Sequence, residues 1–444
     1  MKKDKTLPKS HNSFRTISLG FIILILTGAL LLMLPISSRS RAVTPFRDTL
    51  FTAISASCVT GLVVKDTATH WSFFGQAVIL TLIQIGGMGV ITIGLMVTRL
   101  SGKRIGLSFR GMMQDSISAP QVGGILSLTK FILKTTAIIE LIGAALLYPV
   151  FFRDIGALKG IWYALFHSVS AFCNAGFDLM GIKEPFSSMT GYGGNIYVNT
   201  VLMLLIITGG IGFLTWDDIV QHRHRFKKYR LQTKVVLVTS GLLIILPALF
   251  FFFAEYAGEP AKERVLHSLF QSVTARTAGF NTADLSRMRE PCAMLMTVLM
   301  LIGGCSGSTA GGMKTSTVAV LLLAALSVYR RKNDVECFCR RIPEDIIRTA
   351  GAILFMYMSL FLSTGIAVSL IDSLPLTSCL FETGSALGTA GVTLGITTSL
   401  SLPSRIILMI LMFAGRVGGL TLIYAAFASN NEASRLPQEK ITVG

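Results

Sequence analysis

Four short segments of the chain repeat one arrangement of small and hydroxyl residues that could bind a cation through the backbone. In each segment an aromatic residue is followed by a Ser/Thr-Ala pair and then by a glycine. The segments run from Phe51 to Gly61, Phe166 to Gly176, Phe270 to Gly279 and Phe381 to Gly391. Their glycines are 115, 103 and 112 residues apart, so the arrangement recurs along the whole chain. Glycine permits backbone angles that turn carbonyl oxygens inward, where they can replace the hydration shell of an ion.

The candidate ion-binding residues are the three that end each segment. They are Val59, Thr60 and Gly61; Asn174, Ala175 and Gly176; Thr277, Ala278 and Gly279; and Thr389, Ala390 and Gly391. None of these positions holds a carboxylate. Calcium and magnesium sites favour carboxylates or retained water. The segments therefore favour a weakly hydrated monovalent cation as the bound metal ion.

Each segment lies between two long apolar stretches and is too short to cross a membrane itself. We expect spans near 17–36 and 72–98, near 126–152 and 196–220, near 233–256 and after 291, and near 346–371 and 404–428. A short helix that ends in glycine suits a re-entrant loop, because its exposed backbone is then buried inside protein. Its carboxy-terminal carbonyls would carry a partial negative charge of about half a unit toward the membrane centre.

The predicted fold class is an all-α polytopic membrane protein with eight transmembrane helices. Four repeats, each a span, a re-entrant pore loop and a second span, would surround a pseudo-fourfold pore. The predicted repeats are 1–110 with its filter near 57–62, 111–224 with its filter near 172–177, 225–335 with its filter near 275–280, and 336–444 with its filter near 387–392.

Composition agrees with a membrane protein. Of 444 residues 52% are hydrophobic and 14% are charged, and the formal net charge is +17. Of the 40 Lys and Arg residues, 25 fall in the two tails and in the stretches 99–134, 217–234 and 328–348. Because these stretches alternate with poorly charged ones across the apolar spans, the positive-inside rule places both termini in the cytoplasm. The basic excess thus reflects orientation in a lipid bilayer, and we expect no nucleic-acid partner.

The second span of the third repeat is expected to break inside the membrane. The helical pattern from 291 to 330 would be about 60 Å long at about 1.5 Å per residue, which is twice the hydrocarbon thickness. The stretch 303–314 interrupts it with Gly303, Gly304, Gly307, Gly311 and Gly312 and ends with Lys314. Irregular backbone at this depth must line water or protein, so we interpret 303–314 as a flexible gate beneath the filter.

Two further charged residues lie within apolar spans. Arg416 is midway along the last span, where a charge costs about 2.5–3.5 kcal/mol on insertion scales. It could form a positive barrier in a cation pore and pair with an acidic residue or with carbonyls of the gate; the alternative is a buried structural ion pair. Glu140 raises the same question, and we favour a structural role for it.

These residues together resemble the Trk/Ktr/HKT superfamily of potassium transporters, and most closely the membrane subunit of bacterial Ktr systems. The stretches 56–62, 171–177, 275–281 and 387–393 are similar to its four filters, and 303–315 is similar to its intramembrane gating loop. Arg416 falls where that family has a pore-blocking arginine. The third segment differs, because it is one residue shorter from Phe270 to its glycine and contains Arg276.

The resemblance implies potassium uptake in a bacterial plasma membrane by a homodimer. Glycine at the matching filter positions implies selectivity for potassium over sodium. It also implies a cytosolic ring of nucleotide-binding regulatory subunits resembling KtrA or TrkA, so that any nucleotide is bound by the partner and this chain holds no cofactor of its own.

Two alternatives are open. Residues 304–307 resemble the surroundings of a rhomboid protease serine, so Ser306 could be the nucleophile of an intramembrane enzyme. Such a serine needs a base within hydrogen-bond reach, and the six histidines lie at span ends or in tails, with His167 and His267 interpreted as interfacial. The other alternative is a secondary transporter of another cation, since broken helices are typical of that class. The even number of crossings in each predicted repeat disfavours inverted repeats, and we expect no enzymatic activity.

Overall fold

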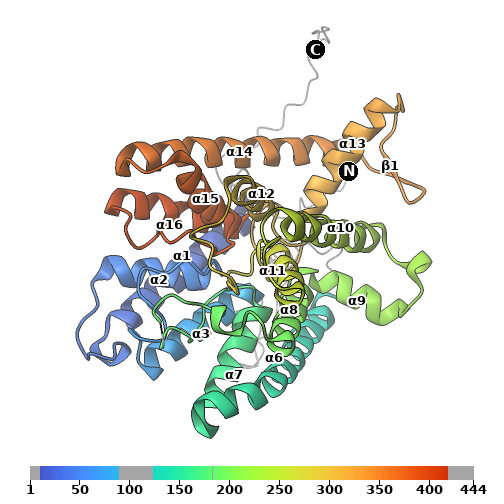
Figure 1. Ribbon diagram of the computed structural model, residues 1–444. Helices are drawn as coiled ribbons and strands as arrows, with labels where there is room; N and C mark the ends of the chain where they lie inside the picture. The colour runs from blue at the N-terminus through green and yellow to red at the C-terminus, as the bar shows by residue number, and fades with distance from the viewer. Residues whose placement is uncertain (1–10, 90–123, 183, 419–444) are drawn as a thin grey trace, which may run out of the picture.

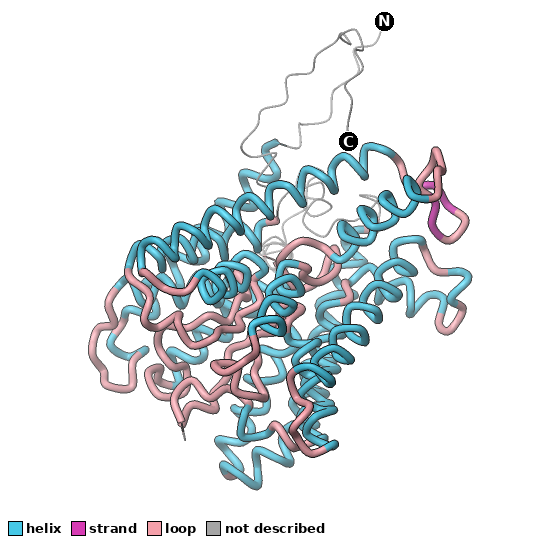
Figure 2. Tube along the Cα trace, turned by 45° about the horizontal axis from the view of Figure 1, so that its top comes forward, coloured by secondary structure: helices cyan, strands magenta, loops and turns pink. Residues whose placement is uncertain are grey.

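The computed structural model describes residues 11–89, 124–182 and 184–418. Regular structure in these ranges is helical, apart from one antiparallel hairpin of β1 (Glu336–Cys337) and β2 (Arg340–Arg341), as Figure 2 shows. The chain passes round the molecule in sequence order, from blue at the lower left of Figure 1 through green and yellow to red at the upper left. Three short 3-10 helices are η1 (Pro35–Ser37), η2 (Thr190–Tyr192) and η3 (Phe226–Lys228).

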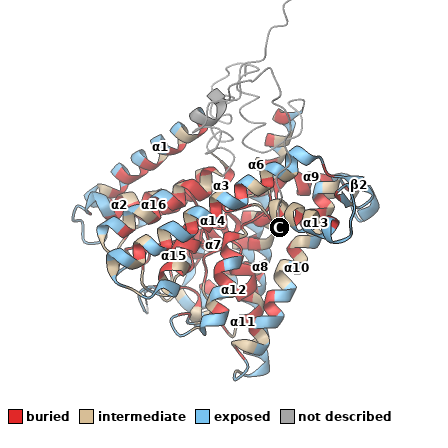
Figure 3. Ribbon diagram, turned by 90° about the horizontal axis from the view of Figure 1, so that it is seen from above, coloured by how far each residue is buried: buried red, intermediate tan, exposed pale blue. Residues whose placement is uncertain are grey.

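Four long apolar helices form the outside of the molecule. They are α1 (His11–Met33), α6 (Ile125–Ile155), α10 (Leu231–Ala254) and α14 (Glu344–Asp372). Within the described residues these are the helices that are individually long and apolar enough to cross a membrane. They expose large hydrophobic side chains, for example Leu141 at 63% and Phe355 at 76%, and Figure 3 shows the exposed outer side of α1. Apolar faces of this extent are typical of contact with lipid.

Four short helices pack inside the long ones. They are α2 (Phe46–Ser57), α7 (Ala157–Phe172), α11 (Ala261–Thr274) and α15 (Leu376–Gly388), which pack on α1, α6, α10 and α14 respectively. Pro45, Pro260 and Pro375 precede three of them, where the fixed φ of proline favours a helix start. Each short helix ends within one of the four repeated segments. The aromatic residues that open these segments are at most 1% exposed, so the core lies around the short helices.

A third set of helices follows the segments. It consists of α3 (Phe73–Met88), α8 (Ile196–Gly210), α12 (Glu290–Leu301) and α16 (Leu402–Val417). Two have side-chain caps: Ser72 accepts a hydrogen bond from the Gly75 N–H, and Asn195 from the Val198 N–H, both at 3.2 Å. Each of the four also packs on the short helix of the next group, so that α3 contacts α7, α8 contacts α11, α12 contacts α15, and α16 contacts α2.

The expected continuous span at 196–220 is wrong. The chain bends by 96° between α8 and α9 (Phe213–His222). Gly212 stands at the bend with φ +94°, a conformation that residues with a Cβ rarely adopt. In the following group α12 ends at Leu301 and α13 (Thr315–Tyr329) begins after the glycine-rich stretch.

Candidate cation site and gate

The four repeated segments meet one another in chain order. A methyl group built on Gly61 would lie 2.6 Å from the carbonyl oxygen of Ala175, and one on Gly176 would lie 2.9 Å from that of Ala278. A methyl group on Gly279 would lie 3.1 Å from the carbonyl oxygen of Ala390. Gly391 completes the circle, because its added methyl group would collide with the Thr60 carbonyl.

One carbonyl from each segment therefore faces the glycine of a neighbouring segment. These four, which we call the carbonyl ring, belong to Thr60, Ala175, Ala278 and Ala390. All four residues are at most 2% exposed. A ring of backbone oxygens in a site removed from bulk water is the arrangement by which a filter can bind a dehydrated cation.

The backbone of each segment has the same sequence of left-handed residues. Val59, Asn174, Thr277 and Thr389 have φ between 53° and 69°, and each is followed two positions later by a glycine with φ between 67° and 95°. This shared conformation is costly for residues with a side chain, by about 1–3 kcal/mol each, and persists where the surroundings impose it. The four segments thus reach one geometry from different side chains.

The shorter third segment reaches that geometry through a different hydrogen bond. In the other three, the N–H of the ring residue donates to the carbonyl five residues earlier, as Thr60 does to Ser55 at 2.8 Å. In the third, the Ala278 N–H donates to Thr274, four residues earlier, at 3.0 Å. The third segment is therefore one residue shorter in the turn that precedes its residue of the carbonyl ring.

In three segments a side-chain hydroxyl forms a hydrogen bond with the backbone at or just after the glycine. The Gly61 N–H donates to Ser55 Oγ at 3.1 Å, Ser170 donates to the Phe177 carbonyl at 2.7 Å, and Thr274 donates to the Phe280 carbonyl at 2.6 Å. Behind the fourth segment, the fully buried Glu382 accepts hydrogen bonds from Thr393 and Thr397. In three of the segments a hydroxyl within the repeated pattern thus holds the backbone in place, a role that spacing alone did not reveal.

His167 is wrongly placed by the sequence interpretation. It is fully buried within α7, and its Nε2 accepts from the Leu179 N–H at 3.1 Å. It therefore supports the chain beyond the second segment and is not interfacial. Its partner comes from a loop that returns after the filter, which the linear sequence does not indicate.

The glycine-rich stretch 303–314, which we call the gating loop, lies against the second and fourth segments. The Thr309 hydroxyl donates to the Phe172 carbonyl at 3.1 Å, at the end of α7. A methyl group built on Gly311 would collide with the side-chain hydroxyl of Thr389 in the fourth segment. Gly312, with φ +67°, donates to the Gly415 carbonyl at 3.2 Å. The loop thus packs directly beside the segments that form the carbonyl ring.

Backbone hydrogen bonds tie the gating loop to the bend between α8 and α9. The Cys305 N–H donates to the Gly210 carbonyl at 2.9 Å, and the Phe213 N–H donates to the Gly307 carbonyl at 2.7 Å. The two ends of the loop lie side by side. The Gly303 N–H donates to the Met313 carbonyl at 2.8 Å, and Gly304 lies against the Ala310 side chain. The loop is therefore hydrogen-bonded to four neighbouring helices, α7, α8, α9 and α16.

Arg416 and Lys314 donate hydrogen bonds to backbone carbonyls in the gating loop, and Arg416 also to carbonyls beside it. The Arg416 guanidinium donates to the carbonyls of Thr309, Gly86 and Gly87, the last at 2.9 Å. The Lys314 ammonium donates to the Ala310 carbonyl at 2.8 Å. From the sequence we expect Arg416 to pair either with an acidic residue or with carbonyls of the gate. The structure shows a carbonyl of the gating loop as its partner, and the ion pairs of the described residues include none to Arg416.

A second set of glycines was missed by the sequence interpretation. Gly86, Gly209 and Gly415 each lie against the last carbonyls of a short helix, at Ser57, Phe172 and Leu387. A Cβ at any of them would collide with that carbonyl, so these glycines let the helices approach the ends of α2, α7 and α15. The signal was present in the sequence as Gly-Gly at 86–87 and 209–210 and Gly-Arg at 415–416.

Glu140 has structural partners. It is 6% exposed, and both of its carboxylate oxygens accept from the Gln84 amide nitrogen, at 3.0 and 3.1 Å, so that it joins α6 to α3. Its backbone carbonyl accepts from Ser168 of α7 at 2.6 Å. These contacts fit the structural role favoured from the sequence.

Ser306 has no recorded histidine partner within the described residues. Its hydroxyl is 3.2 Å from that of Ser316. The described residues also contain no cluster of three or more His, Cys, Asp or Glu side chains suited to a metal ion. The arrangement that the structure brings together is made of backbone oxygens, which suit ion binding.

Comparison with known proteins identifies similar chains. Residues 1–436 match the family model described as TrkH, cation transport protein. The chain is 39% identical to the potassium/sodium uptake protein NtpJ of Enterococcus hirae, over 99% of both chains. It is 37% identical to the Ktr system potassium uptake protein B of Bacillus subtilis, over 97% of this chain and 96% of the relative.

The fold has a match among solved structures. The crystal structure of the potassium transporter TrkH from Vibrio parahaemolyticus superimposes with a TM-score of 0.73 at 18% identity, covering 96% of this chain and 87% of the other. The predicted fold class, a helical polytopic membrane protein, is confirmed.

Proposed function

Because this chain belongs to the TrkH family of cation transport proteins, we propose that it is the membrane subunit that carries potassium ions into a bacterial cell. The family is one of transporters, so the protein is not an enzyme, and the protease interpretation of Ser306 is set aside. The observation that carries the proposal is the carbonyl ring of Thr60, Ala175, Ala278 and Ala390. The contacts between neighbouring segments bring one carbonyl oxygen of each segment into this ring, and such oxygens can replace the water around a potassium ion.

The filter consists of the twelve residues that end the four segments. Backbone oxygens of 59–61, 174–176, 277–279 and 389–391 bind successive ions, and the negative ends of α2, α7, α11 and α15 stabilise them. The left-handed glycines support selectivity, because a side chain at these positions would strain the backbone and displace the neighbouring carbonyl.

The gating loop controls access to the filter from the cytoplasm. Its contacts with Thr389 and with the end of α7 support this role. Gly303, Gly304, Gly307, Gly311 and Gly312 allow the loop to change conformation, while Lys314 and Arg416 stabilise the closed form and repel cations. Opening requires the loop to leave the Arg416 guanidinium.

The assembly follows from the resemblance to Ktr subunits. A homodimer in the plasma membrane, with both termini cytoplasmic, would dock on a ring of nucleotide-binding subunits resembling KtrA or TrkA. The name of the Bacillus subtilis relative describes it as part of a Ktr system, which supports a partner. The basic residues around η3 and the β1–β2 hairpin would face that partner.

The test is rubidium uptake by potassium-starved bacteria that lack their own uptake systems and express this chain. We expect saturable uptake that potassium inhibits far better than sodium. Because one relative is named a potassium/sodium uptake protein, uptake is measured with and without sodium. Equal inhibition by both ions would favour a less selective cation transporter, and no uptake with or without a regulatory partner would contradict the proposal.

A further inference from the structure

Arg276 is a buried cation that the mechanism above does not use. It lies in the third segment directly before Thr277 and is 7% exposed. The matching stretches of the other segments, 57–58, 172–173 and 387–388, contain no charged residue. The described ion pairs include none to Arg276, so no carboxylate explains its burial.

The guanidinium of Arg276 contacts groups that hold both ends of the gating loop. Its Nη2 donates to the hydroxyl of Ser240 on α10 at 3.2 Å and to that of Thr315 at 3.5 Å. Thr315, the first residue after the loop, donates its hydroxyl to the Gly303 carbonyl at 3.1 Å. The Ser240 hydroxyl is 3.6 Å from the Cys305 thiol. Arg276 therefore reaches the loop start through Ser240 and the loop end through Thr315.

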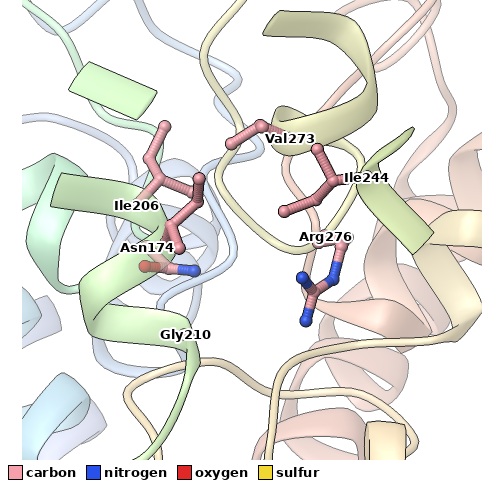
Figure 4. A pocket seen from close by; sticks show the side chains of 7 residues that line it. Asn174, Ile206, Gly210, Ile244, Val273 and Arg276 are labelled. Carbon is pink, nitrogen blue, oxygen red and sulfur yellow. The ribbon is translucent and has the colours of Figure 1, made fainter. Parts of the chain in front are cut away.

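The same side chain borders a small cavity between the second and third segments. Figure 4 shows Arg276 on one side, Asn174 on the opposite side and Gly210 below. The cavity has room for about one water molecule. Arg276 Nε has no hydrogen-bond partner within the described residues. The Arg276 Nε–H group is thus free to donate a further hydrogen bond beside the second segment, while Nη2 contacts the residue at the end of the gating loop.

Together with Lys314 and Arg416, Arg276 makes a third cation beside the gating loop. The first two donate to loop carbonyls at Ala310 and Thr309, whereas Arg276 holds the hydroxyl at the loop end. In a buried site of low dielectric constant, three fixed positive charges raise the energy of a passing cation. They also hold the loop at three different points.

We propose that Arg276 is a positioning residue of the gate, which couples the third filter segment to both ends of the gating loop and holds the loop closed. The inference rests on the proposed function of the loop as a gate. Release of the loop breaks the contact with Thr315 and frees the chain from 303 to 315 to move. The Arg276 guanidinium then remains attached to the third segment.

The test compares matched variants of the full chain, reconstituted in lipid vesicles without a regulatory partner. Arg276→Gln removes the charge, and Arg276→Lys keeps it. Thr315→Val removes the hydroxyl, and Thr315→Ser keeps it. Arg264→Gln is the control, because Arg264 lies on α11, the helix that leads into the third segment, and its guanidinium is 3.9 Å from the centre of the Phe252 ring.

We expect Arg276→Gln and Thr315→Val to raise initial rubidium influx several-fold with unchanged discrimination between potassium and sodium. Arg276→Lys, Thr315→Ser and Arg264→Gln should stay near the wild-type rate. Wild-type rates in both Arg276→Gln and Thr315→Val would overturn the inference, as would a loss of ion discrimination, which would place Arg276 in the filter structure. If Arg276→Gln fails to insert, the Thr315 pair decides the outcome.

A second readout does not depend on ion transport. Cys305 is fully buried in the gating loop, so its labelling by a maleimide, followed by mass spectrometry of that peptide, reports release of the loop. Labelling should accelerate several-fold in Arg276→Gln and Thr315→Val, and unchanged labelling would overturn the inference even if flux changed. If the wild-type protein shows no rubidium influx but Cys305 labelling is faster in the variants, the proposed function is contradicted. The claim that Arg276 and Thr315 hold the gating loop in place is then still supported.

Discussion

The carbonyl of Thr60 lies against Gly391, which joins the first repeated segment to the last. A methyl group built on Gly391 would lie 2.9 Å from the Thr60 carbonyl carbon and 3.0 Å from Gly61 Cα. Two residues at opposite ends of the chain thus complete a ring whose other members follow in sequence order. The relationship explains why four segments with different side chains share one backbone conformation: each glycine must admit the carbonyl of a neighbouring segment.

Gly391→Ser should reduce discrimination between potassium and sodium while leaving the protein in the membrane. The added side chain meets the Thr60 carbonyl, and the backbone at φ +78° is strained by about 1–3 kcal/mol. Gly395→Ser is the matched control, because Gly395 has φ +96° but nothing within 4 Å of an added Cβ. Competition of sodium with rubidium uptake measures the effect. Equal selectivity in Gly391→Ser, Gly61→Ser and wild type would count against the filter.

Arg416→Gln should raise rubidium influx in the absence of a partner. The change removes a positive charge and weakens the hydrogen bonds to Thr309 and Gly87 that keep the gating loop in place. Arg405→Gln serves as the control, since Arg405 is on the same helix but bonds the Thr398 carbonyl and lies near Asp48. If Arg416→Gln transports at the wild-type rate, the gate lies elsewhere.

Glu140→Ala should lower stability without altering ion selectivity. Removal of the carboxylate takes away both carboxylate acceptors of the Gln84 amide and leaves it only the weak contact with the Met88 sulfur, a loss of about 1–3 kcal/mol. Thermal unfolding in detergent measures the loss, with the exposed Glu184→Ala as the comparison. An unchanged unfolding temperature, or altered selectivity at normal stability, would show that Glu140 has a role other than joining α3 to α6.

Potassium affinity should increase as external pH rises through neutrality. Asp178 lies two residues beyond Gly176, and burial, with a contribution from the neighbouring Asp66 carboxylate, raises the pKa of Asp178 to about 7. A carboxyl with a raised pKa is neutral below that pH and negative above it, so higher pH adds a negative charge two residues beyond the glycine that ends the second segment. The half-saturating rubidium concentration should therefore fall as pH increases.

Asp178→Asn should abolish this pH dependence. Asp284→Asn is the control, because hydrogen bonds from Ser286 lower the pKa of Asp284 and keep it ionised throughout this range. Rubidium uptake over a pH series gives the comparison. A pH profile in Asp178→Asn that matches wild type would exclude Asp178 as the titrating group.

The sequence predicted the parts of the fold that depend on local pattern. Four copies of one short segment between apolar stretches indicated the re-entrant helices. The bend between α8 and α9 was missed, because the apolar pattern at 196–220 continues across it. Gly212 and the polar residues Asp217 and Asp218 were available signals.

Contacts between distant segments could not be predicted from spacing. The partner of His167 is a backbone N–H that returns from beyond the filter, and the partners of Arg416 are carbonyls more than a hundred residues away. Arg276 was visible as an unusual charge, but its link to Thr315 depends on how α10, α11 and α13 pack. Such contacts are set by tertiary structure, which a repeat pattern does not determine.

The central claim is that the carbonyl ring binds a dehydrated potassium-like ion, and anomalous diffraction from crystals grown in rubidium tests it most directly. The account predicts a rubidium peak on the axis between the carbonyl oxygens of Thr60, Ala175, Ala278 and Ala390, which excess potassium displaces and sodium does not. Rubidium bound only outside this ring, or carbonyls that point away from the axis, would contradict it.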